Sequence, residues 1–380
     1  MSIPITRPYF GQEEKDALAV PLETGWVVQG PRVQEFEARF RELTGAPHAL
    51  ATTSCTTALH LALQVLGLGG GDEVVIPSFT YVASANVVEQ SGGVPVFVDV
   101  DLATFNIDPA AIEAAITERT KAIMAVHLFG LVADMAPIVA LARRRGVALI
   151  EDAACAVGST LDGQHAGTFG DFGAFSFHAR KVITTGEGGM LTVADDDAAR
   201  RAGIMRSHGA EISDLERHSR GAFALGDHEV VGFNYRMTDL QGALGVVQMG
   251  RLAELIRRRQ AVAARYDAAL ATLPGVEIPA VPRGAEHTYQ SYVVRIAPEA
   301  RMARDAVAMA LQDRGVATRP GTHAVHLLAY YRRKYGLGEA DFPRALDADR
   351  TSLSLPIYPT MTVEEHDYVI ANLSDLLGEP

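Results

Sequence analysis

The chain has 380 residues, of which 48% are hydrophobic and 21% charged, and its formal net charge is -12. This length predicts two lobes rather than one simple core, and the acidic balance argues against unspecific binding to nucleic acid. Because it has two cysteines, no signal peptide and no apolar stretch of membrane length, we expect a cytoplasmic protein without disulfides or membrane segments.

The N-terminal region predicts two amphipathic helices, at residues 13–22 and 31–44. The turn-rich stretch between them carries the only tryptophan, Trp26, which either packs internally or forms an exposed binding element. A predicted strand at 49–53 leads into a small, hydroxyl-rich turn at 54–58 that opens a helix. The free amides of that first helical turn suit a phosphate, although the same turn serves equally well as an ordinary helix cap.

Residues 72–150 alternate between short apolar runs and helical segments. Uninterrupted apolarity indicates strands that are covered on both faces, so the predicted fold class is α/β with a mostly parallel sheet. The strands are expected at 74–77, 94–98, 122–126 and 147–150, with helices at 83–91, 109–115 and 135–144. Ligands gather at the carboxyl ends of such strands, so Tyr81, Asp152 and Lys181 are expected to share a crevice.

Lys181 follows a predicted strand at 172–177 and precedes a glycine-rich turn at 184–189, after which residues 190–193 form another strand. A lysine here and an aspartate at the end of a nearby strand suggest a Schiff-base lysine and a partner for the cofactor's pyridine nitrogen. Most lysines beside glycine turns are solvated surface groups, so the hypothesis depends on the surrounding segments.

The second half of the chain predicts a long linking helix and a smaller α/β unit. A polar segment at 209–232 is expected to be an active-site or interface loop. Thr238 and Gln241 form a capping box that opens a helix reaching to about residue 271. After a break at 274–282, strands are expected at 289–296, 316–319 and 352–356, and helices at 198–205, 303–313, 330–335 and 363–377. We therefore expect a large domain at 1–250, with an N-terminal arm, and a small C-terminal domain at 251–380.

Several motifs, in this order, make the chain resemble the DegT/StrS family of sugar-nucleotide aminotransferases. They include Ser54-Cys55-Thr56-Thr57-Ala58-Leu59, Glu151-Asp152-Ala153-Ala154, Ser176-Phe177-His178 with Lys181, and Asn234-Tyr235-Arg236-Met237-Thr238. The resemblance covers nearly the whole chain. It implies a pyridoxal-phosphate (PLP) enzyme of fold type I, the aspartate aminotransferase fold, with a large domain around a mostly parallel sheet and a smaller C-terminal α/β domain.

The resemblance also implies roles for individual residues. Lys181 would form the Schiff base with PLP and transfer the proton, and Asp152 would pair with the pyridine nitrogen. The remaining cofactor contacts would be stacking by Tyr81, phosphate binding by Thr56, Ser176 and the amide of Cys55, and a contact of Asn234 with the neighbouring subunit's cofactor. The active unit would then be a homodimer with shared sites. Cys155 stands where the family usually has Gln or His beside the phenolic oxygen, and a thiol is a poorer hydrogen-bond partner.

The implied reaction is a ping-pong transfer of an amino group, with L-glutamate as the expected donor and pyridoxamine phosphate (PMP) as the intermediate form. The implied acceptor is a nucleotide-linked keto sugar: a 4-keto-6-deoxy hexose, a 3-keto sugar, a longer keto sugar acid or a cyclitol. No metal is expected. The candidate substrate contacts are Trp26, His178, Arg236, His323 and His326, although a structural role is an equal alternative for each histidine.

The sequence disfavours three alternative functions. A PMP-dependent sugar dehydratase has the same fold, but such relatives carry His at the lysine position, so Lys181 counts against it. A non-catalytic regulatory homologue is disfavoured by the intact pair of Lys181 and Asp152. A nicotinamide-dependent dehydrogenase is disfavoured because no G-x-G-x-x-G motif follows the first strand.

Overall fold

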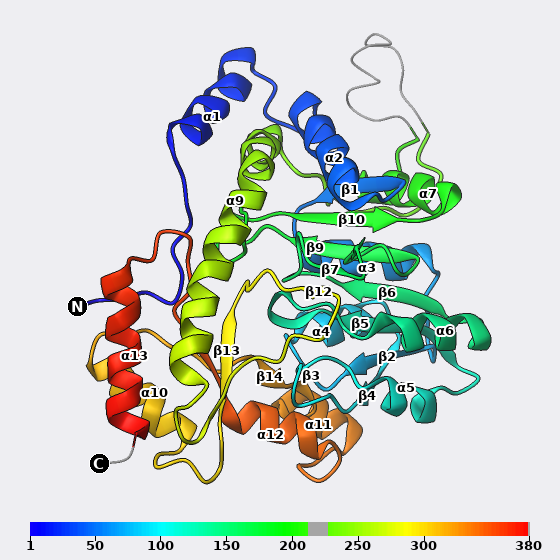
Figure 1. Cartoon of the computed structure of the whole chain (residues 1–380). Helices are drawn as coiled ribbons and strands as arrows, with labels where there is room; N and C mark the ends of the chain where they lie inside the picture. Colours follow the sequence, from blue (N-terminus) through cyan, green and yellow to red (C-terminus); the bar gives the residue numbers. More distant parts are fainter. Residues whose placement is uncertain (212–226, 379–380) are drawn as a thin grey trace.

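The computed structural model describes residues 1–211 and 227–378, so most of the loop predicted at 209–232 lies outside the described residues. A seven-stranded sheet forms the centre of the fold, in the order β1-β10-β9-β6-β5-β2-β4 (Figure 1). The strands are β1 (His48–Thr52), β2 (Glu73–Pro77), β4 (Val94–Val98), β5 (Thr120–Val126), β6 (Ala148–Asp152), β9 (Phe172–Ser176) and β10 (Gly189–Val193). Strands β4, β2, β5, β6 and β9 run parallel, and β10 is antiparallel to both of its neighbours. The prediction of a mostly parallel sheet is confirmed.

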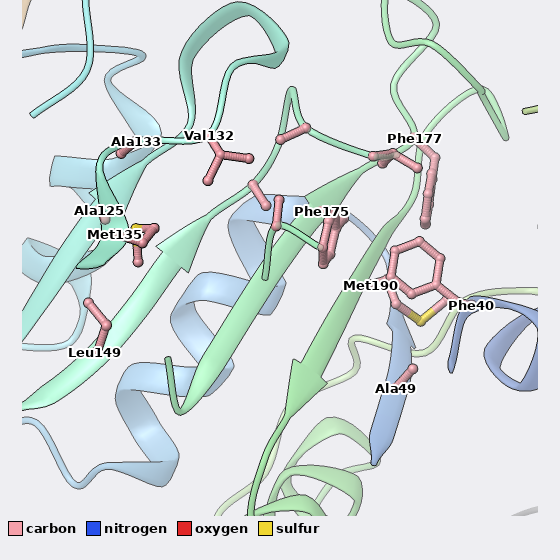
Figure 2. Close-up of a cluster of buried hydrophobic side chains, with 14 of the residues drawn as sticks. Phe40, Ala49, Ala125, Val132, Ala133, Met135, Leu149, Phe175, Phe177 and Met190 are labelled. Carbon is pink, nitrogen blue, oxygen red and sulfur yellow. The ribbon is translucent and has the colours of Figure 1, made fainter. Parts of the chain in front are cut away.

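Both faces of this sheet are buried, which explains the uninterrupted apolar runs. Along β5, Ile123 belongs to the core on one face, whereas Ala122 and Met124 belong to the core on the other. Figure 2 shows part of the first core, in which Phe40 and Phe175 lie with their ring centroids 4.8 Å apart. Each strand therefore contributes side chains to two apolar layers.

Helices form the two outer layers, and their predicted positions are confirmed to within a few residues. The first core includes side chains of α2 (Pro31–Thr44), α5 (Pro109–Ala115), α6 (Met135–Arg145) and α9 (Asp239–Leu270). The second includes those of α3 (Cys55–Val65), α4 (Ala83–Gln90) and α7 (Asp196–Arg206). Helix α1 (Gln12–Thr24) contacts α9. The predicted capping box begins α9: Gln241 N donates to Thr238 Oγ1, and Thr238 N donates to Gln241 Oε1, over 3.3 and 3.0 Å.

The C-terminal elements surround a third core. A three-stranded antiparallel sheet, β11 (Val276–Glu277), β13 (Tyr292–Ile296) and β15 (Ser352–Leu355), packs with α10 (Arg304–Asp313) and α13 (Val363–Leu377). The end of α9 contributes Ala263, Tyr266 and Leu270 to the same core. Nearer the central sheet lie α11 (Ala329–Tyr335), α12 (Pro343–Thr351) and β14 (His323–Ala324), which pairs with β3 (Phe79–Thr80). Strands β7 (Thr160–Leu161), β8 (Gln164–His165) and β12 (Ala285–Glu286) form a small separate sheet.

Two local predictions are corrected. Residues 316–319 form no strand with any described residue, because the segment makes only two isolated bridges there, between Val316 and Ile3 and between Arg319 and Ser354. The strand expected from residue 289 begins at Tyr292, since Tyr289 has a φ of 48° and cannot continue an extended chain. Within residues 1–211 and 227–378, no helix combines the length and the apolar character needed to cross a bilayer.

Candidate active site

A cavity of about 380 Å³ lies at the carboxyl ends of the central strands. Val126, Asp152 and Ser176, the last residues of β5, β6 and β9, all line it. The cavity also brings together the other residues predicted for the cofactor, apart from Asn234: Cys55, Thr56, Tyr81, Cys155 and Lys181. The parallel arrangement of the strands is the reason, since it turns all these chain ends toward one edge of the sheet.

Lys181 projects into the cavity from a compact loop. Its Nζ donates a hydrogen bond to Cys155 Sγ over 3.1 Å, and its backbone N–H donates to the His178 carbonyl over 2.9 Å. The loop closes through Thr185 N, which donates to the Phe177 carbonyl over 3.0 Å. Glycine is required at position 189, because a Cβ there would lie 2.3–2.6 Å from backbone atoms of Ser54 and Cys55. The loop that carries the lysine is therefore packed directly against the first turn of α3.

Asp152 is held in a fixed orientation at the floor of the cavity. Its Oδ2 accepts a hydrogen bond from Ser84 Oγ over 2.8 Å, and its Oδ1 accepts one from the Ala154 amide over 3.2 Å. Cys55 Sγ lies 3.8 Å from Oδ1. Burial raises the pKa of Cys55 well above its usual value, and the charge of Asp152 raises it further, so this thiol is neutral at physiological pH.

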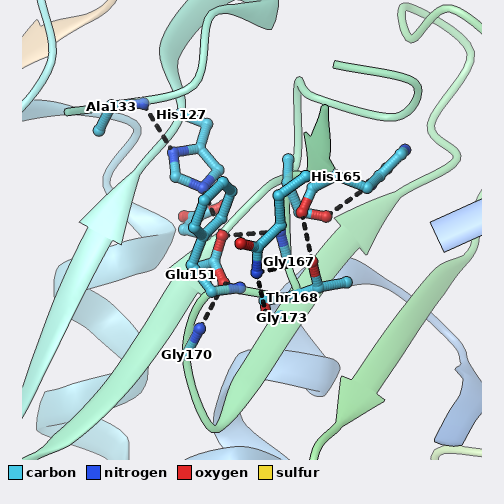
Figure 3. A network of polar contacts seen from close by, with 12 residues as sticks. His127, Ala133, Glu151, His165, Gly167, Thr168, Gly170 and Gly173 are labelled. Atoms are coloured by element: carbon cyan, nitrogen blue, oxygen red, sulfur yellow. Dashed lines mark hydrogen bonds and ion pairs between the residues drawn. The ribbon is translucent and has the colours of Figure 1, made fainter. Parts of the chain in front are cut away.

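A buried polar network joins the ends of β5 and β6, two of the three strands that end at the cavity (Figure 3). The Glu151 carboxylate accepts hydrogen bonds from the amides of Gly167, Phe169 and Gly170, over 2.7–2.8 Å. It also pairs with His127 Nε2 over 2.8 Å. Since His127 Nδ1 accepts from the Ala133 amide, Nε2 carries the ring proton and donates it to Glu151. A wholly buried carboxylate is thus satisfied by four donors, immediately before Asp152 in the chain.

The first turn of α3 supports both interpretations of its hydroxyl-rich sequence. Ser54 is the helix cap, and its Oγ accepts from the Thr57 amide over 3.2 Å. Cys55 and Thr56 nevertheless face the cavity, where Ser176 joins them. This helix N-terminus therefore has a structural cap and still offers donors to an anion.

Of the predicted substrate contacts, only His178 lines the cavity, and burial lowers its pKa. Trp26 Nε1 donates to the Gln29 carbonyl over 3.2 Å, and His326 is buried with its Nδ1 on Ser78 Oγ. Arg236 pairs its backbone with Thr52, and His323 is exposed in β14. Asn234 is also exposed, beside Ser207. These side chains lie outside the cavity that the described part of this single chain forms.

Sequence reasoning missed several residues of the cavity and its support. They are His127, Arg180, Glu187, Gln290, Arg319 and Thr322, which line it, and Ser84, which orients Asp152. Glu151 could have been found, because a second carboxylate next to Asp152 on a buried strand requires partners. No sequence pattern marks Gln290 or Arg319 as a cavity residue, since their approach to the cavity depends on how the C-terminal elements pack.

These residues fit PLP. The cavity combines a primary amine that can bind an aldehyde, a buried carboxylate that can hold a protonated ring nitrogen, and a helix N-terminus flanked by hydroxyls that can bind a phosphate. Tyr81, which is 61% exposed, provides an aromatic ring at the cavity wall.

Comparisons with known proteins agree with this fit. GDP-perosamine synthase of Caulobacter vibrioides is 41% identical over 377 residues, covering 99% of this chain and 98% of that protein. The spore coat polysaccharide biosynthesis protein SpsC of Bacillus subtilis is 40% identical, covering 99% and 97%. Among solved structures, Spr1654 of Streptococcus pneumoniae in its PMP form has a TM-score of 0.93 and 30% identity, covering 99% of each chain, and a PLP form is also known.

The family-level match extends over almost the entire sequence. The sequence pattern of the DegT/DnrJ/EryC1/StrS aminotransferase family matches residues 8–374. The fold, the lysine and carboxylate in one cavity and these relatives lead to one conclusion: the chain belongs to the PLP-dependent DegT/DnrJ/EryC1/StrS aminotransferase family.

Proposed function

We propose that the protein moves an amino group from an amino acid, with L-glutamate as the first candidate, to the keto group of a nucleotide-linked sugar. The observation that carries the proposal is that Lys181 and Asp152 face one cavity together with the first turn of α3. The sugar acceptor is supported by the relatives, one a GDP-perosamine synthase and another a polysaccharide biosynthesis protein. Lysine at position 181 favours amino transfer over sugar dehydration.

When bound, PLP supplies an aldehyde that combines with amines and a ring that absorbs an electron pair. We assign the binding of the aldehyde to Lys181 Nζ, which afterwards takes the proton from the α-carbon of the amino acid. Asp152, oriented by Ser84 and Ala154, holds the proton on the ring nitrogen.

The other cofactor contacts are proposed from their positions around the cavity. The hydroxyls of Thr56 and Ser176 and the amide of Cys55 bind the phosphate, and the Tyr81 ring covers one face of the cofactor. Cys155 contacts the phenolic oxygen, more weakly than an amide or imidazole would. Together these contacts hold the reacting carbon near Lys181, so that in both half-reactions the reacting groups are already aligned and need not meet by diffusion.

We further propose a homodimer in which Asn234 reaches the phosphate of the neighbouring site. Asn234 is exposed, and the next residue accepts a hydrogen bond from Thr53 N, just before the turn at the cavity. Val28, before α2, and Val231, shortly before Asn234, are 54% and 87% exposed, which suits an interface. Trp26, Arg236 and His323 would then contact substrate only in the dimer, whereas the buried His326 has a structural role on Ser78.

We also propose two domains and a cytoplasmic location. Residues 1–250 and 251–380 form two domains linked by α9, which is supported by the separate third core around β13 and β15. The two free cysteines, Cys55 and Cys155, agree with a cytoplasmic location.

The proposal is tested first on the cofactor. Purified protein should be yellow with PLP, and L-glutamate should shift its absorption toward that of PMP. Lys181→Ala should no longer be fixed to the cofactor by borohydride, whereas Lys121→Ala, a change at an exposed lysine of β5, should behave as the unaltered protein does. If borohydride still attached PLP to the Lys181→Ala chain, the assignment of the lysine would be wrong.

The acceptor and the dimer need separate experiments. PMP-loaded protein is incubated with a panel of nucleotide-linked keto sugars, and formation of an amino sugar is followed by mass spectrometry. Mixing inactive Asn234→Ala and Lys181→Ala chains should restore part of the activity, because one of the two sites in a mixed dimer is intact. Absence of any complementation would contradict the shared site.

A further inference from the structure

Arg319 is a cationic side chain in the cavity wall, and no carboxylate of residues 1–211 or 227–378 forms an ion pair with it. It lines the cavity near Gln290 and Thr322, and its backbone carbonyl accepts a hydrogen bond from Ser354 N over 2.8 Å. The bridge to Ser354 in β15 fixes the backbone from which the guanidinium extends.

The hydrogen bonds of this guanidinium are incomplete. Nη2 donates to Ser291 Oγ over 3.3 Å, and the buried Nε has no partner among the described residues. Two other poorly exposed arginines have more partners. Arg259 also has an Nε without a partner among the described residues, but its Nη1 donates to three backbone carbonyls. Arg304 pairs with Asp305 and also donates to the Ser352 carbonyl. A guanidinium has five N–H donors, so Arg319 keeps donors for a ligand.

The cavity wall around Arg319 has more positive charge than its own residues neutralise. Arg180 also lines the cavity, and within residues 1–211 and 227–378 neither arginine forms an ion pair with a carboxylate. Burial lowers the pKa of Arg319, the charge of Arg180 lowers it further, and Cys155 opposes both effects. An arrangement that disfavours a cation in this way is stabilised when an anion binds to it.

The position of Arg319 indicates which anion fits. Arg319 Nη2 donates to Ser291 Oγ, and the neighbouring Gln290 donates over 3.0 Å to the carbonyl of Arg180, the residue before Lys181. In an amino acid, the carboxylate and the reacting amino group are attached to the same carbon. In a nucleotide-linked sugar, the diphosphate is separated from the reacting carbon by atoms of the sugar ring. An anion held on the lysine side of the cavity therefore matches the amino acid.

We propose that Arg319 binds the α-carboxylate of the amino-acid donor. This inference rests on the proposed function, because it takes an amino acid as the first substrate. Arginine and carboxylate form two parallel hydrogen bonds, which fix the orientation of the α-carbon as well as its position. Arg319 thereby directs the α-proton toward Lys181 and selects donors that carry a carboxylate over simple amines.

The test separates the two half-reactions. The PLP form of the unaltered chain and of Arg319→Gln is titrated with L-glutamate and with L-alanine, and the loss of the yellow absorption is recorded. Loss of a charge-assisted pair should raise the half-saturating concentration about 10- to 100-fold for both amino acids, since both have the α-carboxylate. Arg319→Lys keeps the charge but lacks the planar guanidinium. Its half-saturating concentration should therefore lie between those of the unaltered chain and of Arg319→Gln. Arg333→Gln, a change at an exposed arginine of α11, is the matched control.

Two other measurements keep the result unambiguous. Calorimetric titration with glutarate, which has carboxylates but no amine, measures anion binding without turnover, and Arg319→Gln should bind it at least about tenfold more weakly. In the second half-reaction, affinity of the PMP form for the nucleotide-linked keto sugar should change by less than about threefold, since Arg319 is assigned to the other substrate.

The outcomes distinguish this inference from the proposed function. Unchanged half-saturation by amino acids in Arg319→Gln would overturn the role of Arg319 while leaving the amino transfer intact. Weaker binding of the nucleotide sugar with normal binding of amino acids would assign Arg319 to the diphosphate instead, which also overturns it. If no amino acid converts the unaltered PLP form, the proposed function is wrong, and equal glutarate binding by both chains would overturn the anion site as well.

Discussion

Cys155 Sγ accepts a hydrogen bond from Lys181 Nζ over 3.1 Å. The only other cysteine, Cys55, lies at the same cavity but faces the Asp152 carboxylate. The two thiols thus have opposite electrostatic partners within one site. Cys55 is also more buried than Cys155, and burial raises its pKa well above the usual value.

This contrast predicts selective alkylation. N-ethylmaleimide should modify Cys155 at least about tenfold faster than Cys55, because the thiolate is the reactive form and Cys55 remains a thiol. Modification should abolish activity, PLP should protect, and Cys155→Ser should be insensitive. Peptide mass spectrometry over time checks the order. Faster modification of Cys55 would contradict the assigned environments.

Ser84 is predicted to support catalysis through Asp152. Its hydroxyl donates to Oδ2 over 2.8 Å, so Ser84→Ala leaves that oxygen without this donor in a buried position. We expect kcat to fall about tenfold and PLP to bind more weakly. Ser91→Ala is the control, since Ser91 is buried next to the same helix and donates only to the Val87 carbonyl. Equal kinetics of the two variants would remove Ser84 from this role.

Glu151 is predicted to stabilise the fold more than any surface carboxylate. In Glu151→Gln, the new amide group would face amide donors of the segment at 167–170, so a repulsive contact replaces a hydrogen bond. We expect a loss of about 3 kcal/mol in the free energy of unfolding, measured with urea. Glu113→Gln, which breaks an exposed pair with Arg144, should cost less than about 1 kcal/mol.

Gly189 is predicted to tolerate no side chain. In Gly189→Ala, the Cβ would overlap backbone atoms of Ser54 and Cys55, so the lysine loop must move away from α3. We expect PLP affinity to fall at least about tenfold, because both parts of the site are displaced. Gly250→Ala meets nothing within 4 Å inside α9, and should instead add up to about 1 kcal/mol of stability. Normal PLP affinity in Gly189→Ala would show that the contact can relax.

Stability should fall in mild acid, partly through His287. Burial lowers the pKa of this histidine to about 3, so the folded chain holds it neutral, while the unfolded chain takes up a proton near pH 6.5. A lowered histidine pKa has no effect on stability above about pH 6.5. Below that pH it destabilises the folded chain increasingly, because only the unfolded chain binds the proton. By pH 5 the loss is about 2 kcal/mol for this group. The unfolding free energy of His287→Gln should depend less on pH between 6.5 and 5, and an unchanged slope would contradict the shift.

The sequence predicted those parts of the fold that have a local signal. The strands at 74–77 and 122–126 were visible because both of their faces are buried, and the start of α9 was visible because Thr238 and Gln241 cap each other directly. Residues 316–319 looked like a strand, but a strand requires a neighbour, and the sequence does not show which segment provides one.

The residues of the site likewise include some with a local sequence pattern and some without one. Lys181 and Asp152 were predictable because each follows a recognisable strand and motif. Arg319 was not, because it reaches the cavity only after the C-terminal elements pack against the central sheet. Ser84 was missed for a related reason: a serine in a helix has no distinctive pattern, and its role depends on the carboxylate that it contacts across the fold.

The order of strands in the sheet has a consequence for synthesis on the ribosome. β1 is made first, but it lies at the edge of the sheet beside β10, which emerges much later. The apolar face of α2 is also incompletely covered until α9 has been made, since α2 packs against α9. The earliest segments therefore leave the exit tunnel long before their partners exist, and contacts of such long sequence separation form slowly. We expect nascent chains that stop before α9 to require chaperones, because Val33 and Phe36, which lie against Gly242 and Gly245 of α9, remain partly uncovered until then.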